Sequence, residues 1–208
     1  MKQIEKLLEQ KIASVLGTLD PAHDLLHVKR VVATAKKLAL EEKADLDVVV
    51  PAAWLHDLVN LPKDHPERKS ASTMASKEAI FFLKSIHFPA DKFEAIAHAI
   101  AAHSFSSGIV PETLEAKIVQ DADRLDGLGA IGLARLFSIS TQLKRPFYHS
   151  ADPFAVQREW DDQDNAIDHI FIKLKKVVEL MNTTSAKAEA ERRFIIIENF
   201  LNDLKKEI

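Results

Sequence analysis

Residues 46–58 read Leu-Asp-Val-Val-Val-Pro-Ala-Ala-Trp-Leu-His-Asp-Leu. In this stretch an apolar run is followed by a histidine and an aspartate. The run from Val48 to Leu55 is apolar on every face, which is typical of a helix buried in a protein core. We therefore predict a central helix over about 46–58. The pair His56-Asp57 at its end needs a partner, because burying unpaired polar groups costs several kcal/mol. A metal ion is one such partner.

The rest of the chain also favours helices. Apolar residues recur at helical spacing in the first segment, at Ile4, Leu8 and Ile12, and Asp20-Pro21 is a typical helix start. The remaining helices are expected at about 22–42, 67–86, 90–103, 113–122, 130–143, 165–181 and from 186 to the C-terminus. Only five glycines occur and Asn-Gly is absent, which argues against a hairpin-rich β protein. We predict a single all-α domain over 1–208, with an irregular stretch at 145–164.

Composition excludes several functional classes. Of 208 residues, 47% are hydrophobic and 28% are charged, which is ordinary for a globular protein and excludes a disordered one. Cysteine is absent, so disulfide and thiolate chemistry are excluded. The net charge of −3 gives no basic field, so we expect no nucleic-acid partner. No apolar run approaches the roughly 18 residues of a membrane span, and residues 1–16 lack the core of a secretory signal. We expect a cytoplasmic protein without a membrane partner.

Two further motifs stand on either side of the His56-Asp57 pair. His27 opens His-Val-Lys-Arg-Val within a predicted helix, and Asp123 lies in Ala-Asp-Arg-Leu-Asp, where a helix meets a glycine-containing turn. The order His, His-Asp, Asp resembles the HD superfamily of metal-dependent phosphohydrolases, and the small bacterial HD-domain hydrolases in particular. The resemblance covers about 20–135 and implies a multi-helix HD-domain bundle there, followed by a helical extension over about 145–208.

The resemblance implies that His27, His56, Asp57 and Asp123 are the ligands of one divalent metal. The ligand chemistry agrees with this implication, since two imidazoles and two carboxylates suit a transition metal better than a closed structural zinc site. We expect Mn²⁺ first, with Fe²⁺, Co²⁺ and Ni²⁺ as the alternatives. Four protein ligands leave positions open for water and a phosphate oxygen.

The loop after the predicted metal helix supplies two candidate catalytic residues. Lys63 can neutralise phosphate charge, and Asp64 can orient the attacking water. The sequence departs here from the nucleotide monophosphatases of the superfamily, which carry a glutamate three residues after the His-Asp pair. This chain has Asn60 at that position, so that general acid cannot be transferred.

Three more residues are candidates for contact with the substrate. Arg30 lies one turn after His27 on the same helix face, where it can bind phosphate or form a salt bridge to Asp57 or Asp126. Arg124 presents the same two alternatives. His103, at a predicted helix end, is a candidate phosphate contact or general acid.

The resemblance implies a small phosphorylated substrate, which we expect to be a nucleotide. The expected reaction is hydrolysis of a nucleoside triphosphate to monophosphate and pyrophosphate, favoured slightly by Asn60. The alternatives are a 5′-nucleotidase-type phosphomonoesterase, a non-catalytic nucleotide sensor that contains a metal, and a helical scaffold with a structural ion. The amphipathic first and last helices are candidate interfaces for a homodimer, on which the sequence does not decide.

Overall fold

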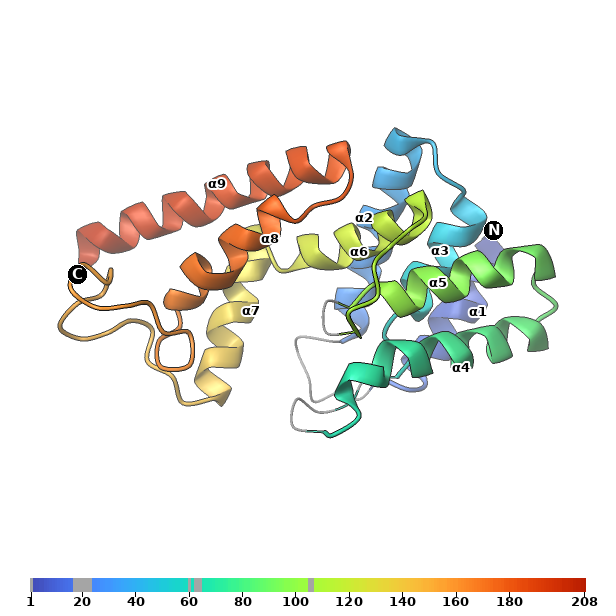
Figure 1. The fold of residues 1–208 in the computed structure, drawn as a ribbon, viewed down its shortest axis with the longest axis horizontal. Helices are drawn as coiled ribbons and strands as arrows, with labels where there is room; N and C mark the ends of the chain where they lie inside the picture. The colour runs from blue at the N-terminus through green and yellow to red at the C-terminus, as the bar shows by residue number, and fades with distance from the viewer. Residues whose placement is uncertain (1, 17–23, 60, 62–64, 105–106) are drawn as a thin grey trace. The chain divides into compact units, whose positions relative to one another are not determined.

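The structure, a computed structural model, describes residues 2–16, 24–59, 61, 65–104 and 107–208, and the regular secondary structure in these ranges is helical. No strand occurs in those ranges. The α-helices are α1 (Lys2–Ala13), α2 (Leu25–Glu42), α3 (Leu46–Leu55), α4 (Ala71–Ser85), α5 (Phe93–Ala102), α6 (Leu114–Asp126), α7 (Gly129–Gln142), α8 (Lys175–Glu179) and α9 (Thr184–Glu207). Short 3-10 turns η1 (Arg68–Ser70) and η2 (Ala90–Lys92) precede α4 and α5, and a π-helical turn η4 (Ile170–Leu174) precedes α8. The all-α prediction is confirmed (Figure 1).

The chain divides into two compact units, residues 1–123 and 124–208. The first unit contains α1 to α5 and most of α6, and the second contains α7 to α9. The single domain expected over 1–208, with a core at about 20–135 and an extension at about 145–208, stays a prediction.

Helix α3 is the centre of the first unit. It packs against α1, α2, α4 and α5, and every residue from Val48 to Leu55 is buried. This all-round burial explains why its sequence shows no polar face. Because α3 is enclosed by its neighbours, the residues that follow Leu55 enter the interior of the unit.

Several helix boundaries differ from those expected, and three of them bear on the site. Helix α2 begins at Leu25 after an Asp24 cap, and the expected start signal at residues 20–21 lies outside the described residues. Helix α3 ends at Leu55, so His56 and Asp57 lie in the turn that follows it. Helix α6 continues to Asp126 instead of stopping near 122, since the next helix-breaking residue is Gly127. Asp123 is therefore a helical residue.

In the second unit, α7 and α8 both pack against α9. Gly129 opens α7 with φ +71°, a conformation that L-residues rarely adopt, and a Cβ there would lie 3.3 Å from the Cβ of Arg193. A Cβ at Gly132 would lie 2.2 Å from the carbonyl oxygen of Gly127. These contacts require glycine at both 129 and 132.

The expected irregular stretch extends further than predicted, because regular helical structure resumes at Ile170 instead of near 165. A buried ion pair fixes this stretch. Arg158 binds both carboxylate oxygens of Asp168, at 2.5 and 2.9 Å, and the backbone N–H of Asp161 donates to the same carboxylate at 2.8 Å. Asp168 is fully buried.

The ionisation of Glu189 on α9 makes the stability of the fold depend on pH. Its carboxylate accepts hydrogen bonds from Arg192 and Arg193 at 2.8 Å, and these bonds outweigh burial and lower its pKa from 4.5 to about 2. A depressed folded-state pKa stabilises the fold above pH 4.5, and the contribution is lost as pH falls toward 2. Because solvent screens Arg192, we expect Glu189→Gln to cost about 1–2 kcal/mol more at pH 6 than at pH 3. Urea unfolding at both pH values checks this, and an equal cost at both would contradict it.

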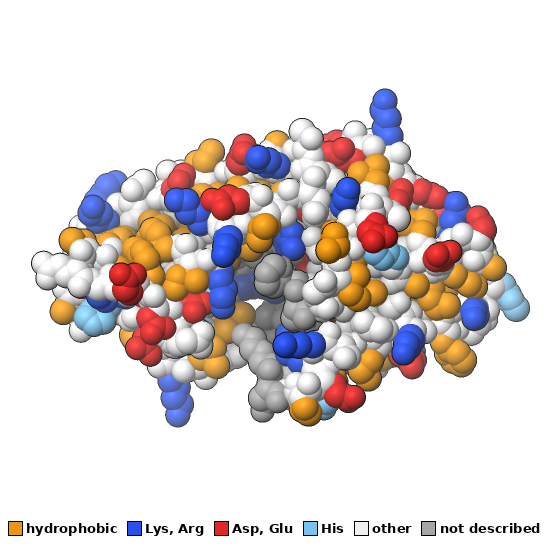
Figure 2. Space-filling model, in the orientation of Figure 1, with side chains coloured by type: hydrophobic (Ala, Val, Ile, Leu, Met, Phe, Trp, Pro, Cys, Tyr) orange, Lys and Arg blue, Asp and Glu red, His pale blue; other side chains and the backbone are white. Residues whose placement is uncertain are grey.

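Acidic and basic side chains are interspersed on the face drawn in Figure 2, in keeping with the small net charge of the chain. Within the described residues, no helix combines the length and apolar character needed to cross a membrane.

Candidate metal centre

The first histidine of the candidate centre, His27, lies in the first turn of α2. Its backbone N–H donates to the side chain of Asp24 at 2.7 Å, and this bond caps the helix. The side chain of His27 is fully buried. Asp24 therefore determines where α2 begins and, with it, where His27 lies; sequence reasoning missed this role, although aspartate three residues before His27 is a typical cap signal.

His56 and Asp57 come from the turn that ends α3. His56 Nδ1 lies 2.8 Å from the carbonyl oxygen of Ala53, and this contact fixes the ring so that Nε2 faces away from the helix. His56 is 1% exposed. Burial lowers its pKa, because the charged imidazolium is penalised in the protein interior.

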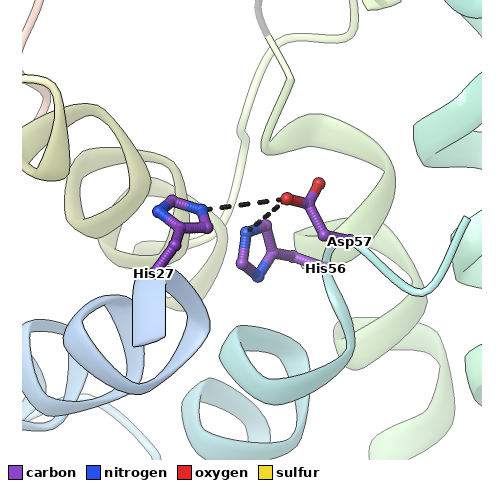
Figure 3. Close-up of side chains that lie close together, drawn as sticks. All are labelled: His27, His56 and Asp57. Atoms are coloured by element: carbon purple, nitrogen blue, oxygen red, sulfur yellow. Dashed lines mark ion pairs between the residues drawn. The ribbon is translucent and has the colours of Figure 1, made fainter. Parts of the chain in front are cut away.

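These side chains converge on one point. Asp57 Oδ2 lies 3.8 Å from His27 Nε2 and 3.5 Å from His56 Nε2 (Figure 3). The ligand atoms of the three residues all lie within 4.8 Å of one another. Asp123, from α6, adds a fourth group, since its Oδ1 lies 3.4 Å from His27 Nε2 and 3.8 Å from His56 Nε2. The structure thus brings together the four residues that the sequence singled out.

Asp123 is held in its ionised form. Burial alone would raise its pKa, but the contact with His27 and the charges of the surrounding histidines outweigh burial and lower it. Its side chain keeps 29% exposure, whereas both histidines are at 0%. The cluster therefore presents two carboxylates and two buried imidazoles.

A fifth residue, His103, borders the cluster. Its Nε2 lies 3.7 Å from Asp57 Oδ1, the carboxylate oxygen that does not face His27 and His56, and its ring centroid lies 4.9 Å from that of His56. Burial opposes protonation, but the facing carboxylate of Asp57, with Asp123, raises the pKa of His103. His98, earlier on α5, makes a different contact, since its Nε2 accepts from the backbone N–H of Glu112.

The four central residues fit a divalent metal. Two donors that each lie about 2.1 Å from one ion are separated by roughly 3 to 4 Å, and the four histidine–carboxylate distances range from 3.4 to 3.8 Å. His56 Nε2 is buried and has no hydrogen-bond partner in the described part of the chain. An ion would satisfy this nitrogen, whose burial is otherwise costly.

The structure describes only some of the other candidate residues. Lys63 and Asp64, with Asn60, fall outside the described residues. Arg30 is half-buried on α2. Arg124 Nη1 donates to the carbonyl oxygen of Leu180, a contact within the second unit. Binding of phosphate by either arginine stays a prediction.

The cap of α2 gives a direct prediction. We expect Asp24→Ala to destabilise the protein by about 1 kcal/mol, and to weaken Mn²⁺ binding about tenfold because His27 loses its backbone anchor. Thermal unfolding and calorimetric titration with Mn²⁺ measure the two effects. Thr183→Ala is the matched control, since Thr183 caps α9 in the other unit; a stability loss without weaker Mn²⁺ binding in both variants would contradict the prediction.

Comparison with known proteins identifies the family of this chain. The HD domain family model matches residues 25–128. The curated Bacillus subtilis protein YpgQ is 31% identical over 212 aligned residues, which cover 100% of this chain and 95% of YpgQ. The crystal structure of YpgQ in complex with ADP superposes with a TM-score of 0.76 at 30% identity, covering 98% of this chain and 97% of that one.

Two further solved structures agree. An HD-superfamily hydrolase of Bacillus thuringiensis has a TM-score of 0.77 at 29% identity, over 99% of this chain and 97% of its own. A Lactobacillus plantarum protein has a TM-score of 0.74 at 31% identity, over 100% of this chain and 97% of its own. The family match includes all four converging residues, and the chain belongs to the HD domain family.

Proposed function

We propose that this protein is a metal-dependent phosphohydrolase that acts on nucleotides and splits nucleoside triphosphates into monophosphate and pyrophosphate. The observation that carries the proposal is the convergence of His27, His56, Asp57 and Asp123, with both histidine Nε2 atoms within 3.8 Å of both carboxylates. Such a group of donors suits hydrolysis, because an ion such as Mn²⁺ would accept water and substrate beside these four protein ligands.

In this proposal the four residues hold one divalent ion, with Mn²⁺ the first expectation and Fe²⁺, Co²⁺ or Ni²⁺ the alternatives. When bound, the ion supplies Lewis acidity, which activates water and offsets charge on phosphate oxygens. Asp57 and Asp123 together balance its two positive charges. His56 keeps its Nε2 lone pair available because its Nδ1 is held by the carbonyl of Ala53.

His103 is the proposed contact between protein and phosphate. Its Nε2 lies 3.7 Å from Asp57 Oδ1, whereas His27 and His56 are paired with the other oxygen, Oδ2. A histidine at this position can donate a hydrogen bond to a phosphate oxygen or a proton to the leaving oxygen. The facing carboxylate holds the ring in place for either task.

The remaining roles rest on sequence. Lys63 would offset phosphate charge and Asp64 would orient the attacking water, as the loop after the metal helix suggests. Arg30 and Arg124 are the further candidates for phosphate charge. A homodimer also stays a prediction.

Two considerations support a nucleotide with more than one phosphate. The relative YpgQ has been crystallised in complex with ADP, which carries a diphosphate. Asn60 replaces the glutamate that monophosphatases of the superfamily use. Both favour cleavage of a phosphoanhydride over cleavage of a monoester.

The test is a hydrolysis screen of the purified protein with Mn²⁺, using ribo- and deoxyribonucleoside mono- and triphosphates and mass spectrometry of the products. We expect pyrophosphate and nucleoside monophosphate from triphosphates. His56→Ala should abolish turnover, and His98→Ala, a histidine outside the cluster, should retain it.

Each alternative predicts another result. Free phosphate and nucleoside from monophosphates would replace the proposal by a 5′-nucleotidase. Nucleotide binding without turnover would indicate a sensor. Loss of stability on metal removal, with no effect of nucleotides, would indicate a scaffold with a structural ion.

A further inference from the structure

Three side chains bind the C-terminal end of α5. The last four carbonyl groups of an α-helix have no partner within the helix. In α5, three of these four carbonyls accept from buried side chains: Ile100 from His103 Nδ1 at 2.7 Å, Ala101 from Ser72 Oγ at 2.9 Å, and Ala102 from Gln120 Nε2 at 2.7 Å. These three hydrogen bonds fix the end of the helix, where His103 follows directly.

Gln120 is distinguished from the other donors by its position. It lies on α6, three residues before Asp123, and is 3% exposed. Residues three apart on a helix lie on neighbouring positions of one face. Gln120 binds the carbonyl of Ala102, which forms the peptide bond to His103. The side chain of Gln120 therefore links α6, which carries Asp123, to the end of α5, which His103 follows directly.

We propose that Gln120 is a positioning residue for the reaction. Its amide fixes the end of α5 relative to α6, and so holds His103 Nε2 beside Asp57 Oδ1. The inference rests on the proposed hydrolase function, since His103 is the residue through which Gln120 acts. Gln120 itself contacts neither metal nor substrate in this role.

Ser76 on α4 offers a matched comparison. Its hydroxyl donates to the carbonyl of Ala97 at 2.9 Å, so it also binds α5, but five residues before Ala102. Ser76 is 7% exposed. Its loss removes a buried hydrogen bond to the same helix without releasing the end that carries His103.

The first experiment compares Gln120→Met, which removes the donor at similar volume, with Ser76→Ala. For the Mn²⁺-loaded enzyme we expect Gln120→Met to lower kcat about tenfold, because misplacement of a reacting group lowers turnover steeply. Its KM and Mn²⁺ affinity should stay within about twofold of the wild type. Ser76→Ala should leave all three unchanged. Equal kcat in the two variants would overturn the inference.

A double-mutant cycle with His103→Ala separates positioning from general loss of structure. If Gln120 acts through His103, Gln120→Met should lower kcat no further once His103 is replaced. Independent, multiplicative losses would overturn the inference. Gln120→Leu, which also removes the donor and adds no charge, replaces Gln120→Met if that variant does not fold.

A measurement without turnover keeps this inference distinct from the proposed function. In the metal-free protein, Gln120→Met should shift the side-chain NMR resonances of His103 and leave those of His98 in place, whereas Ser76→Ala should shift neither. If the wild type hydrolyses no nucleotide, the proposed function fails while this readout still decides the positioning role. Unshifted His103 resonances in Gln120→Met would overturn it.

Discussion

Replacement of Asp57 by alanine is expected to abolish turnover and to weaken Mn²⁺ binding by more than about 100-fold, beyond the losses seen when residues that only orient ligands are removed. Asp57 contacts every histidine of the cluster: Oδ2 faces His27 and His56, and Oδ1 faces His103.

The effect on stability should depend on the metal. A ligand that binds only the folded state stabilises it by about 2.7 kcal/mol at a concentration 100 times its Kd. The wild type should therefore melt higher in excess Mn²⁺ than in EDTA, and Asp57→Ala should melt at one temperature in both. Asp91→Ala, whose side chain is 73% exposed, is the control. A Mn²⁺-dependent rise in the melting temperature of Asp57→Ala would contradict the ligand assignment.

The second large effect is expected in the other unit. Arg158→Met should destabilise the protein by about 3–5 kcal/mol, because it leaves the fully buried carboxylate of Asp168 without its bidentate partner. For a chain of this size, the melting temperature should fall by roughly 10 °C. Urea or thermal unfolding measures the loss.

Two variants test whether the loss comes from the stranded charge. Arg158→Met combined with Asp168→Asn should recover part of the stability, since the buried group is then neutral. Arg192→Met, which removes an arginine with a side chain 61% exposed, should cost less than about 1 kcal/mol. A double variant that is less stable than Arg158→Met alone would contradict this account.

The parts of the fold that the sequence predicted are those governed by local pattern. The uninterrupted apolar run before His56 identifies α3 as a central helix, because no polar face remains to meet solvent. The boundaries were less predictable, since Asp20-Pro21 and Asp24 are both start signals and only the second begins α2 in the described chain. Near residue 165 the helical spacing continues, but the helical turn η4 begins only at Ile170.

The residues of the candidate site also differ in how far the sequence could predict them. His27, His56, Asp57 and Asp123 could be selected because their order matches a known family. The contact of His103 with Asp57 could not be derived from sequence, since it depends on how α5 packs against α3. Gln120 gives no local signal either, because its partner is a carbonyl at the end of a helix 18 residues earlier.

The burial of Trp54 in α3 gives the metal centre an optical reporter. The chain has two tryptophans, and Trp54, 5% exposed, lies two residues before His56. The other, Trp160, stacks on Phe171 at 3.9 Å in the second unit. Open-shell ions such as Mn²⁺, Co²⁺ and Ni²⁺ quench nearby indole emission, whereas Mg²⁺ does not. In a Trp160→Phe background, fluorescence from Trp54 alone should therefore report the arrival of a paramagnetic ion in real time, without an added dye.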